Sequence, residues 1–572
     1  MSILHAVKMV NANQGASGCQ TNSYVTAASF MLLGVLKILY AFRLRIDSDE
    51  TQHLHVVWSW TQGLLPYRDT FDNHSPLFQF LCAPYFALMG EHSNVVSPMR
   101  LLVVPLYFLT LWCTYRLGRR LWSRSVGLSA AILCGAYPIF FVKSSEFRPD
   151  DLWAPLWLLS ILALTARPFR NRHAFLGGLA MGACFITTMK TSALALSLGG
   201  AGAALLVCRI FRCEKPRSSQ IVAPLGLFIS ATGILPLVVV IFFAAHHALP
   251  QLYYGAIVHN LTPALFKPQY ACRFGMMAPM AAVAILGGAC AWRWRNVDRD
   301  LVLFLGLTTL LYLSLIMFIW PLVEPHDALP IIPIVALFFI PLTYEIANTF
   351  GRSALAWWQR IGIPIAGLLE LGILFVAYSP LQNEMKDKLS FIDNVLRLTT
   401  RNDFVMDAKG ESIFRRRPFF YVLEGITLRR MELGLLADDI PARLIETTTP
   451  IATTLRMPPR ACDFIEENYL PVAFRLRVLG KELGLRPNDS DPSAYKIDIV
   501  IPARYTIVAQ RATIAATIDG TPLAGGRYLE PGPHDVTVSS GNGEIELIWA
   551  DAIEKGFSPF SPRASDFPGA SD

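Results

Sequence analysis

Long apolar segments recur through the first two thirds of the chain, and they constrain its fold more than any other feature. A helix that crosses a membrane needs about 20 mostly apolar residues, and eleven segments come near that length, several of them falling short. The sequence therefore predicts a mainly α-helical polytopic membrane bundle with about eleven transmembrane helices. One neighbouring pair, 174–188 and 191–207, could also form a single long span. The eleven segments are 25–44, 101–117, 126–142, 152–166, 174–188, 191–207, 221–245, 274–292, 301–320, 328–346 and 361–378.

The composition agrees with a membrane protein that carries some soluble mass. Of the 572 residues, 53% are hydrophobic and 16% are charged, whereas soluble domains carry about 25% charged residues. The net charge of +7 does not indicate nucleic-acid binding, because Arg and Lys lie in short loops between the apolar segments. The ten Cys include no CxxC pair, and only Cys462 follows residue 380. An internal disulfide in that last region and a structural zinc site are therefore not expected.

Basic residues predict how the chain is oriented in the membrane. If the eleven segments are right, one set of short loops carries most of the Arg and Lys, for example Arg119, Arg170, Arg212, Arg293 and Arg360. The positive-inside rule makes that side cytoplasmic. The N-terminus is then inside, and an odd number of spans places everything after residue 378 outside. We expect a multi-pass protein of a bacterial-type cytoplasmic (inner) membrane with an extracytoplasmic, periplasmic C-terminal region.

The composition changes after residue 380, where charged residues become more frequent and apolar runs shorten. Residues 401–424 predict a strand, a turn and a helix, and alternating residues separated by Gly and Pro pairs predict short strands further on. Those strands are expected at 505–509, 513–518, 535–538 and 545–549. The predicted organisation is a cytoplasmic tail at 1–24, a transmembrane domain at 25–380 with an outer loop at 45–100, an extracytoplasmic α+β region at 381–500, a small β-sandwich at 501–556 and a disordered tail at 557–572.

The outer loop is expected to lie along the membrane as two surface helices. Residues 51–63 and residues 76–89 are each too short to cross a bilayer. The first stretch mixes apolar and polar residues, and the second is mostly apolar, which suits helices at the membrane interface. Between them lies a turn-forming stretch rich in Asp, Asn, His and Pro. Carboxylates and histidines at the mouth of a membrane are costly to desolvate, so their presence indicates a functional site.

Acidic residues recur where predicted spans end on the outer side, and cations accompany them. Carboxylates beside cations at the rim of an apolar cavity suit a reaction between a lipid phosphate and a hydroxyl or amine acceptor. A carboxylate can take the proton of the acceptor, and cations can stabilise the charge that grows on the leaving phosphate. The residues concerned are Asp47, Asp49, Glu50, Lys143, Glu146, Arg148, Asp150, Asp151, Lys190, Glu324, His326 and Asp327.

Four short motifs, taken in order, resemble the GT-C superfamily of membrane glycosyltransferases. They are Asp49-Glu50 after the first apolar segment, Pro66-Tyr67 before the turn Asn73-His74-Ser75-Pro76-Leu77, Arg148-Pro149-Asp150 after the third segment, and His326-Asp327-Ala328-Leu329-Pro330 before a late one. The nearest branch holds protein O-mannosyltransferases and lipid A aminoarabinose transferases, and the resemblance covers about residues 25–378. It implies a polyprenyl-phosphate-linked sugar donor, inversion at the sugar and a catalytic Asp in the first outer loop.

The resemblance also implies roles for individual residues. Asp49 takes the place of the catalytic base and Asp150 the acidic position of the second loop, with Glu50 as a third catalytic candidate. His74 stands where relatives often have a Lys that meets the donor phosphate. Because His is only partly charged near neutral pH, Arg68 or Lys190 could share that task. The predicted substrate-binding residues are Arg68, His74, Glu146, Arg148, Lys190, His326 and Asp327.

Several of these residues also have plainer interpretations. Asp47 is expected to cap the helix that begins next to it, and Glu50 could be a solvated helix residue. Arg148 could be an ion-pair partner of Glu146 instead of a phosphate ligand. His53 and His55 are expected at the membrane interface, and the run at 415–417 is expected to be a solvated face or a lipid-headgroup contact.

The leading interpretation is a membrane glycosyltransferase with a lipid-linked sugar donor. The alternatives are a membrane transporter and a non-catalytic glycan-binding membrane protein. Transporters place ionisable groups near the midplane and contain repeated halves, whereas here the charged groups gather at the outer ends of the spans. We expect no cofactor and no tightly held metal, although the acidic rim could bind a divalent cation loosely. The expected partners are the polyprenyl-phosphate sugar donor, membrane lipid and an acceptor that is a glycan, a lipid or a protein, with no nucleic acid.

Overall fold

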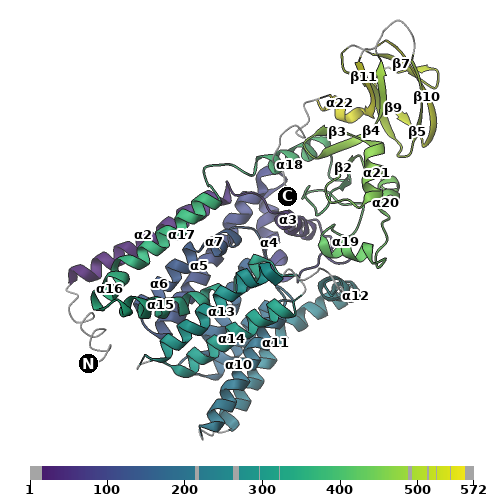
Figure 1. The fold of residues 1–572 in the computed structure, drawn as a ribbon. Helices are drawn as coiled ribbons and strands as arrows, with labels where there is room; N and C mark the ends of the chain where they lie inside the picture. The colour runs from purple at the N-terminus through teal and green to yellow at the C-terminus, as the bar shows by residue number, and fades with distance from the viewer. Residues whose placement is uncertain are drawn as a thin grey trace.

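The chain forms a long helical bundle at one end and a strand-rich region at the other, as Figure 1 shows. The computed structural model describes residues 16–212, 218–261, 270–294, 297–320, 322–486, 493–511, 514–523, 525–540 and 543–560. Helix α2 starts at the end of the bundle that lies away from the strands. Most of the predicted N-terminal tail and residues 561–572 of the predicted disordered tail lie outside the described residues.

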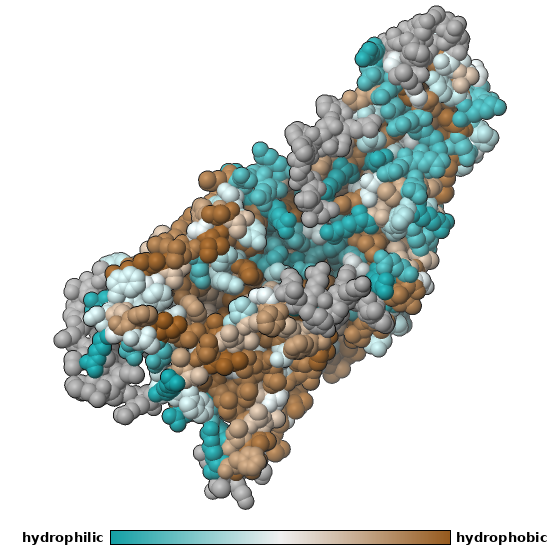
Figure 2. Space-filling view, viewed as in Figure 1, coloured by the Kyte–Doolittle hydropathy of each residue, from teal (hydrophilic) through white to brown (hydrophobic). Residues whose placement is uncertain are grey.

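All eleven predicted segments are helical, but their number as membrane spans is not confirmed. Among the described residues, eight helical segments are long and apolar enough to cross a membrane: 24–41, 93–121, 191–211, 222–245, 273–292, 299–318, 332–349 and 352–377. The bundle helices are α2 (Ala16–Ala41), α5 (Val96–Leu121), α6 (Arg124–Ala136), α7 (Pro138–Lys143), α8 (Asp150–Leu164), α9 (Asn171–Phe185), α10 (Thr191–Phe211), α11 (Ser218–Ala245), α13 (Tyr270–Trp292), α14 (Arg299–Phe318), α15 (Ile332–Thr349), α16 (Arg352–Trp357) and α17 (Ile363–Ala377). Figure 2 shows apolar residues over the bundle surface, as contact with lipid requires.

The predicted segments that fall short are broken or brief helices. The segment 126–142 divides at Tyr137, because Pro138 cannot donate to the preceding turn and instead begins α7. Helices α8 and α9 have 15 residues each. Helices α9 and α10 are separated by residues 186–190, so the possible single long span at 174–207 is ruled out.

A buried lysine fastens α2 to the loop that follows α7. Lys37 donates to the Phe141 carbonyl and to the hydroxyls of Ser144 and Ser145, each at 2.8 Å. The side chain is 1% exposed, and these three bonds use all three donors of an ammonium group. Lys37 therefore holds the start of the loop 144–149, which carries the polar residues described below.

One of the two helices of the outer loop departs from its predicted position at the membrane surface. The outer loop contains α3 (Ser48–Thr61), α4 (Leu77–Met89) and η1 (Ser93–Val95). Ten residues of α3 in a row, from Glu50 to Ser59, are buried, so His53 and His55 are interior residues and their expected interfacial position was wrong. Helix α4 exposes Phe80, Leu81 and Leu88, which agrees with a helix at the membrane interface.

The C-terminal region is a mixed α and β structure that begins directly after the bundle. Its helices are α18 (Lys386–Leu398), α19 (Gly425–Glu432), α20 (Ile440–Glu446), α21 (Pro459–Asn468) and α22 (Ala550–Glu554). Its strands are β1 (Val405–Met406), β2 (Ile451–Ala452), β3 (Tyr469–Ala473), β4 (Leu476–Arg486), β5 (Ser493–Ile499), β6 (Ala503–Ala509), β7 (Ala515–Ile518), β8 (Thr521–Pro522), β9 (Arg527–Leu529), β10 (Gly532–Ser540) and β11 (Gly543–Trp549). Four of these strands, β6, β7, β10 and β11, match the four predicted ones within a few residues.

The strands form two sheets, and their pairing differs from the predicted division at residue 500. One sheet has the order β1-β2-β4-β11-β6-β9 with β3 also paired to β4, and the other has the order β5-β10-β7-β8. Strand β4 pairs with β2 and β3 on one side of that boundary and with β11 on the other. A long central strand therefore joins the parts that the sequence had separated.

Residues 407–424 contain no helix, contrary to the prediction for 401–424. Strand β1 is followed by turns and bends until α19 begins at Gly425. The expected solvated face at 415–417 was also wrong for two of its residues. Arg415 is buried and donates to Glu91 at 2.9 Å, and the Arg417 side chain pairs with buried Asp407 at 3.1 Å. Arg416 is exposed.

One hydrophobic core runs from the outer loop into the C-terminal region. It contains Leu54 and Val57 of α3 and Phe86 of α4, together with Phe414 and many residues of the two sheets. The ring of Phe86 lies 5.8 Å from that of Phe414. The C-terminal region thus covers α3, which explains why that helix is buried instead of lying at the membrane surface.

Candidate active site

Helix α3 begins with a capping box that gives Asp47 and Glu50 structural roles. The Asp47 carboxylate accepts the backbone N–H of Asp49 at 2.9 Å, and the Glu50 carboxylate accepts the backbone N–H of Asp47 at 2.9 Å. Such a box satisfies N–H groups that the first helical turn leaves without partners. The predicted capping by Asp47 is therefore observed.

Glu50 is occupied on every side by structural partners. Arg100 donates to its two carboxylate oxygens at 2.7 and 2.5 Å, and the Phe147 backbone N–H donates to it at 2.7 Å. The side chains of Glu50 and Arg100 are both 0% exposed. The interpretation of Glu50 as a solvated residue is thus wrong, and its contacts favour positioning of the outer loop over catalysis.

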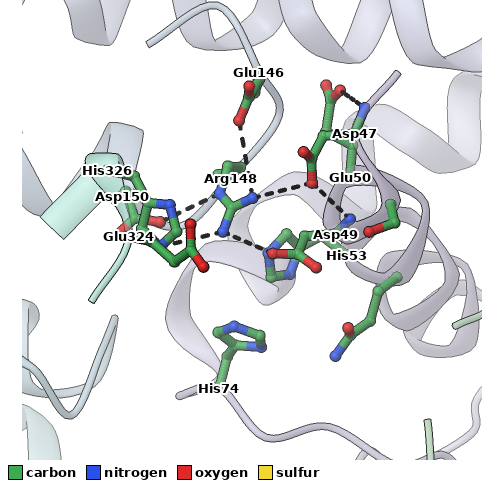
Figure 3. A network of polar contacts seen from close by, with 12 residues as sticks. Asp47, Asp49, Glu50, His53, His74, Glu146, Arg148, Asp150, Glu324 and His326 are labelled. Atoms are coloured by element: carbon green, nitrogen blue, oxygen red, sulfur yellow. Dashed lines mark hydrogen bonds and ion pairs between the residues drawn. The ribbon is translucent and has the colours of Figure 1, made fainter. Parts of the chain in front are cut away.

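Arg148 lies at the centre of the polar cluster (Figure 3). Its guanidinium is 2.9 Å from Asp49, 3.3 Å from Asp47, 3.5 Å from Asp150 and 3.8 Å from Glu146. The side chain is 4% exposed. Arg148 therefore gathers carboxylates from the first and second outer loops, and Glu146 is its most distant ion-pair partner instead of its main one.

A lysine of the C-terminal region, which the sequence reasoning missed, completes the surroundings of Asp49. The Lys409 ammonium lies 2.5 Å from one Asp49 oxygen, while Arg148 meets the other. Lys409 is 360 positions away in the chain, and it stands in a segment that the sequence assigned to a separate region. The local pattern Asp-Ala-Lys-Gly-Glu carries no signal that would have found it.

The charge of Asp49 is fixed by these two cations. Burial alone would raise its pKa, but Arg148 and Lys409 more than offset this and hold the pKa well below the ordinary value. The Asp49 side chain is 26% exposed, so part of the carboxylate remains open. Asp49 is consequently an ionised group at neutral pH that an incoming molecule can reach.

A second group of residues lies on the other side of Arg148. Asp150 starts α8, and His326 and Asp327 belong to the short helix η3 (Pro325–Ala328). The Arg148 guanidinium lies 3.4 Å from His326 Nε2, and Lys190 forms an ion pair with fully buried Asp327. Burial raises the pKa of Asp327, an effect that Lys190 opposes, and burial followed by Arg148 lowers the pKa of His326 well below its ordinary value. His326 is thus neutral and can act as a hydrogen-bond partner.

The polar cluster lies in a protein whose overall shape has known counterparts. The crystal structure of ArnT from Cupriavidus metallidurans in the apo state matches with a TM-score of 0.55 and 13% identity, over 80% of this chain and 98% of that chain. The structure of the same protein bound to undecaprenyl phosphate matches with a TM-score of 0.56 and 12% identity, over 81% and 98%. This chain shares its overall fold with ArnT.

A sequence comparison supports the same grouping. Residues 73–241 match the family model described as dolichyl-phosphate-mannose-protein mannosyltransferase. A comparison with curated proteins gives no match. The resemblance to GT-C membrane glycosyltransferases that the four motifs indicated is therefore confirmed, with a mainly helical bundle and a strand-containing C-terminal region as expected.

Two predicted substrate-binding residues do not join the cluster around Arg148. Arg68 pairs with its neighbour Asp69 at 2.9 Å, and its side chain is 45% exposed. It lines a separate cavity of about 430 Å³ with Tyr67, Tyr254 and Tyr421, among others. His74 is bonded to Asp72 at 3.1 Å, and none of its contacts among the described residues reaches Arg148.

His74 is nevertheless linked to the active-site helix through a second histidine. Its ring packs edge-on against His53 of α3, with centroids 4.5 Å apart, and Figure 3 shows the His53 ring beside Asp49 and the His74 ring farther from Arg148. Burial, and then His74 and Arg148, lower the pKa of His53 well below its ordinary value. His53 is therefore neutral beside Asp49.

Among the residues that the structure describes, one set of side chains could meet a metal ion. Ligand atoms of Asp150, His326 and Asp327 all lie within 4.8 Å of one another, and all three residues are buried. Arg148 and Lys190 already contact these groups, so a divalent ion would have to compete with two cations. The expectation of no tightly held metal stays a prediction.

Proposed function

We propose that this protein transfers a sugar from a polyprenyl-phosphate donor to an acceptor on the outer face of the membrane, with inversion at the sugar and Asp49 as the general base. The observation that carries the proposal is the position of Asp49. Its ionised, partly open carboxylate stands at the start of α3, where the chain leaves α2, and lies beside Arg148. The fold shared with an ArnT structure that binds undecaprenyl phosphate supports a lipid-phosphate donor.

The proposed reaction divides the labour between Asp49 and the cations. An acceptor O–H or N–H group attacks the anomeric carbon from the face opposite the phosphate, and its proton passes to Asp49. The bond between the anomeric carbon and the phosphate oxygen breaks, and its electron pair stays on the phosphate. The released polyprenyl phosphate carries one more negative charge than the donor, so Arg148 stabilises the transition state more strongly than the ground state.

The burial of the cluster makes that stabilisation effective. Arg148, Glu146 and Asp150 are each less than 10% exposed, and charges interact more strongly where water is excluded. Glu146 and Asp150 fix the guanidinium in place, which lowers the reorganisation that the reaction would otherwise require. Lys190 and Asp327 extend the polar wall, and we assign them to binding of the donor or the acceptor.

The acceptor and the location of the reaction are also part of the proposal. The acceptor is a glycan, a lipid or a protein, and the C-terminal region stands on the periplasmic side of a bacterial inner membrane. Helix α3, which carries Asp49, and the C-terminal region lie at the same end of the bundle, opposite the start of α2. A donor can then keep its prenyl chain in the bilayer while its phosphate reaches the cluster.

A transfer assay with the purified protein tests this proposal. The protein, in detergent or nanodiscs, is incubated with a panel of undecaprenyl-phosphate sugars and with acceptor lipids, glycans and membrane proteins. We expect sugar transfer by the wild type with at least one pair and loss of transfer in the Asp49→Asn variant. Transfer that is unaffected by Asp49→Asn would refute the assignment of the base, and absence of transfer by the wild type with every donor and acceptor pair would refute the glycosyltransferase proposal.

A further inference from the structure

Lys409 belongs to the C-terminal region, yet its side chain ends inside the cluster of the membrane bundle. Its ammonium contacts Asp49 at 2.5 Å and the Ser48 hydroxyl at 3.5 Å, and the side chain is 8% exposed. An ammonium has three donors, and its contacts among the described residues leave one donor for a ligand. A buried lysine placed beside a proposed base needs a reason beyond solubility.

The segment around Lys409 is built to hold that lysine in place. The buried Asp407 carboxylate accepts the backbone N–H groups of Gly410 and Ser412 at 2.6 and 2.8 Å, and it pairs with Arg417 at 3.1 Å. The Lys409 backbone N–H donates to Glu411 at 2.7 Å. These bonds fix the turn from both sides, so the direction of the Lys409 side chain is set by the local backbone.

Gly410 allows this turn to press against α3. Its φ of +82° lies in the left-handed region that favours glycine, and a Cβ at this position would come within 2.7 Å of the His55 Cβ. His55 in turn contacts the Ile413 carbonyl through Nδ1 at 2.9 Å. The turn is therefore fastened to the helix that carries Asp49, and the backbone of Lys409 is held beside Asp49.

A donor phosphate that enters this site competes with Asp49 for the nearby cations. Arg148 is poorly suited to turn, because four carboxylates and His326 surround its guanidinium. Lys190 is paired with fully buried Asp327. Lys409 has a flexible stem and rotatable donors, and Asp49 is its single ion-pair partner among the described residues.

We propose that Lys409 binds the phosphate of the polyprenyl-linked donor, and that this contact draws its ammonium away from Asp49 and so frees the carboxylate to accept the acceptor's proton. This inference rests on the proposed function and adds a catalytic residue from the C-terminal region to it. The phosphate then meets Lys409 and Arg148 together, and their charges stabilise the leaving polyprenyl phosphate. Without a donor, Asp49 stays paired with Lys409 and Arg148, and its lowered pKa makes it a poor base.

Binding of undecaprenyl phosphate to the full-length protein tests the contact without any sugar transfer. We expect Lys409→Met to weaken this binding by about 10- to 100-fold, the range expected for losing one hydrogen bond between charged groups. Lys386→Met, at an exposed position of α18, is the matched control and should bind like wild type. Inorganic phosphate at the same concentration should compete poorly, because the proposed ligand is the lipid headgroup and not the free ion.

A double variant separates direct contact from simple charge balance. In an Asp49→Asn background, loss of Lys409 no longer leaves an unpaired carboxylate, which also protects the fold. If Lys409 touches the phosphate, Asp49→Asn/Lys409→Met should bind at least about tenfold more weakly than Asp49→Asn alone. Equal binding by these two variants, or wild-type binding by Lys409→Met, would overturn the proposal.

The failure of this inference can be told apart from failure of the proposed function. A wild-type protein that binds undecaprenyl phosphate through Lys409 but transfers no sugar would refute the proposed function alone. A protein that transfers sugar normally in the Lys409→Met variant would refute the role of Lys409 alone. A wild-type protein that does not bind undecaprenyl phosphate would refute both.

Discussion

Arg100 and Glu50 form a fully enclosed ion pair with 2.5 Å between guanidinium and carboxylate, one residue away from the partly open carboxylate of Asp49. Arg100 also donates to the backbone carbonyls of Leu44 and Arg45 at 2.8 and 2.7 Å. The pair therefore fastens the end of the first membrane helix, the start of α3 and the start of α5 together. Two adjacent acids thus serve different purposes, Glu50 in the architecture and Asp49 in the proposed chemistry.

This pairing predicts that Glu50→Gln destabilises the protein. The variant leaves Arg100 charged in a site without water, and breaking a buried pair in this way costs about 3–5 kcal/mol. We expect a lower melting temperature and a lower yield of folded protein in detergent, with Lys386→Met at an exposed position of α18 as the control that keeps near-normal stability. The double variant Glu50→Gln/Arg100→Met should recover part of the loss. A Glu50→Gln variant that melts like wild type but transfers no sugar would show that Glu50 has a catalytic role.

The second prediction compares Asp49 with Asp47. Asp49→Asn keeps the size of the side chain but cannot accept the acceptor's proton, and general-base catalysis is typically worth about 10²–10⁴ in rate. We expect a loss of turnover in that range while undecaprenyl phosphate still binds. Asp47→Asn should have a much smaller effect, because Asn is also a good N-cap residue.

The comparison requires equal amounts of folded protein for both Asp variants. Turnover is measured with saturating donor, so that differences in donor affinity do not enter. Normal turnover in Asp49→Asn together with a dead Asp150→Asn variant would show that the base is misassigned. Equal losses in Asp47→Asn and Asp49→Asn would show that the charge around Arg148 matters more than proton transfer.

The third prediction concerns pH. Burial raises the pKa of Glu146 to about 7, although Lys143 and Arg148 oppose the shift. Below that pH Glu146 is neutral, and above it the new negative charge competes for Arg148 with a bound phosphate. We therefore expect Glu146→Gln to bind undecaprenyl phosphate like wild type at pH 6 and more tightly than wild type at pH 8. Taking the difference between the variants removes the titration of the ligand itself.

The titration of Glu146 should also make the stability of the folded protein depend on pH. Between the ordinary Glu pKa of about 4.3 and about 7, the folded protein holds a proton on Glu146 that the unfolded chain has lost. Stability from this group therefore falls as the pH rises through that window and is constant above it. The Glu146→Gln variant should lack this part of the pH dependence in thermal unfolding, and an unchanged profile would refute the raised pKa.

The sequence predicted the helices of the bundle well because their signal is local. A run of apolar residues such as 301–320 gives a helix whatever lies elsewhere in the chain, and α14 is found at Arg299–Phe318. The acidic positions at span ends were also found, because a charge next to an apolar run is visible in the sequence. Asp49, Arg148, Asp150 and His326 accordingly meet in one cluster.

The features that could not be predicted from the sequence depend on contacts between residues that are far apart in the chain. Glu50 and Asp49 look alike in the chain, and only Arg100, 50 positions away, separates their roles. Lys409 lies in the segment for which the sequence predicts a strand, a turn and a helix. Its contact with Asp49 forms only because the C-terminal region packs on α3. The same packing buries His55, which on its own helix looks like a membrane-surface residue.

The fourth prediction concerns orientation. The charge pattern places Arg119 and Arg212 inside and Ser539 outside, and Ser539 lies on an exposed part of β10. After Cys462, the partly exposed thiol of the C-terminal region, is replaced by Ser, an impermeant thiol reagent should label Ser539→Cys in intact cells. Arg119→Cys and Arg212→Cys should react only after the membrane is opened. Protection of Ser539→Cys together with labelling of Arg119→Cys would reverse the topology.

The last prediction concerns the C-terminal region by itself. Its two sheets hold most of their own core, and Cys462 is a free thiol. We therefore expect a fragment of residues 381–560 to show β-rich circular dichroism in reducing buffer. The segment around Lys409 is different, because it takes contacts from Asp49, His55 and Glu91 of the outer loop.

In the excised fragment that segment loses those partners and should lose its fixed structure, since local order depends on the contacts that remain. Limited digestion with trypsin should then cut the fragment after Arg415 or Arg416, while the full-length protein resists cleavage at these sites under the same conditions. Mass spectrometry of the products identifies the cut.

A fragment without β-rich circular dichroism would show that the sheets need the bundle to fold. A fragment that resists trypsin as well as the full-length protein does would show that the turn holding Lys409 is ordered without α3, and that its fit against Asp49 is formed by docking of two preformed surfaces.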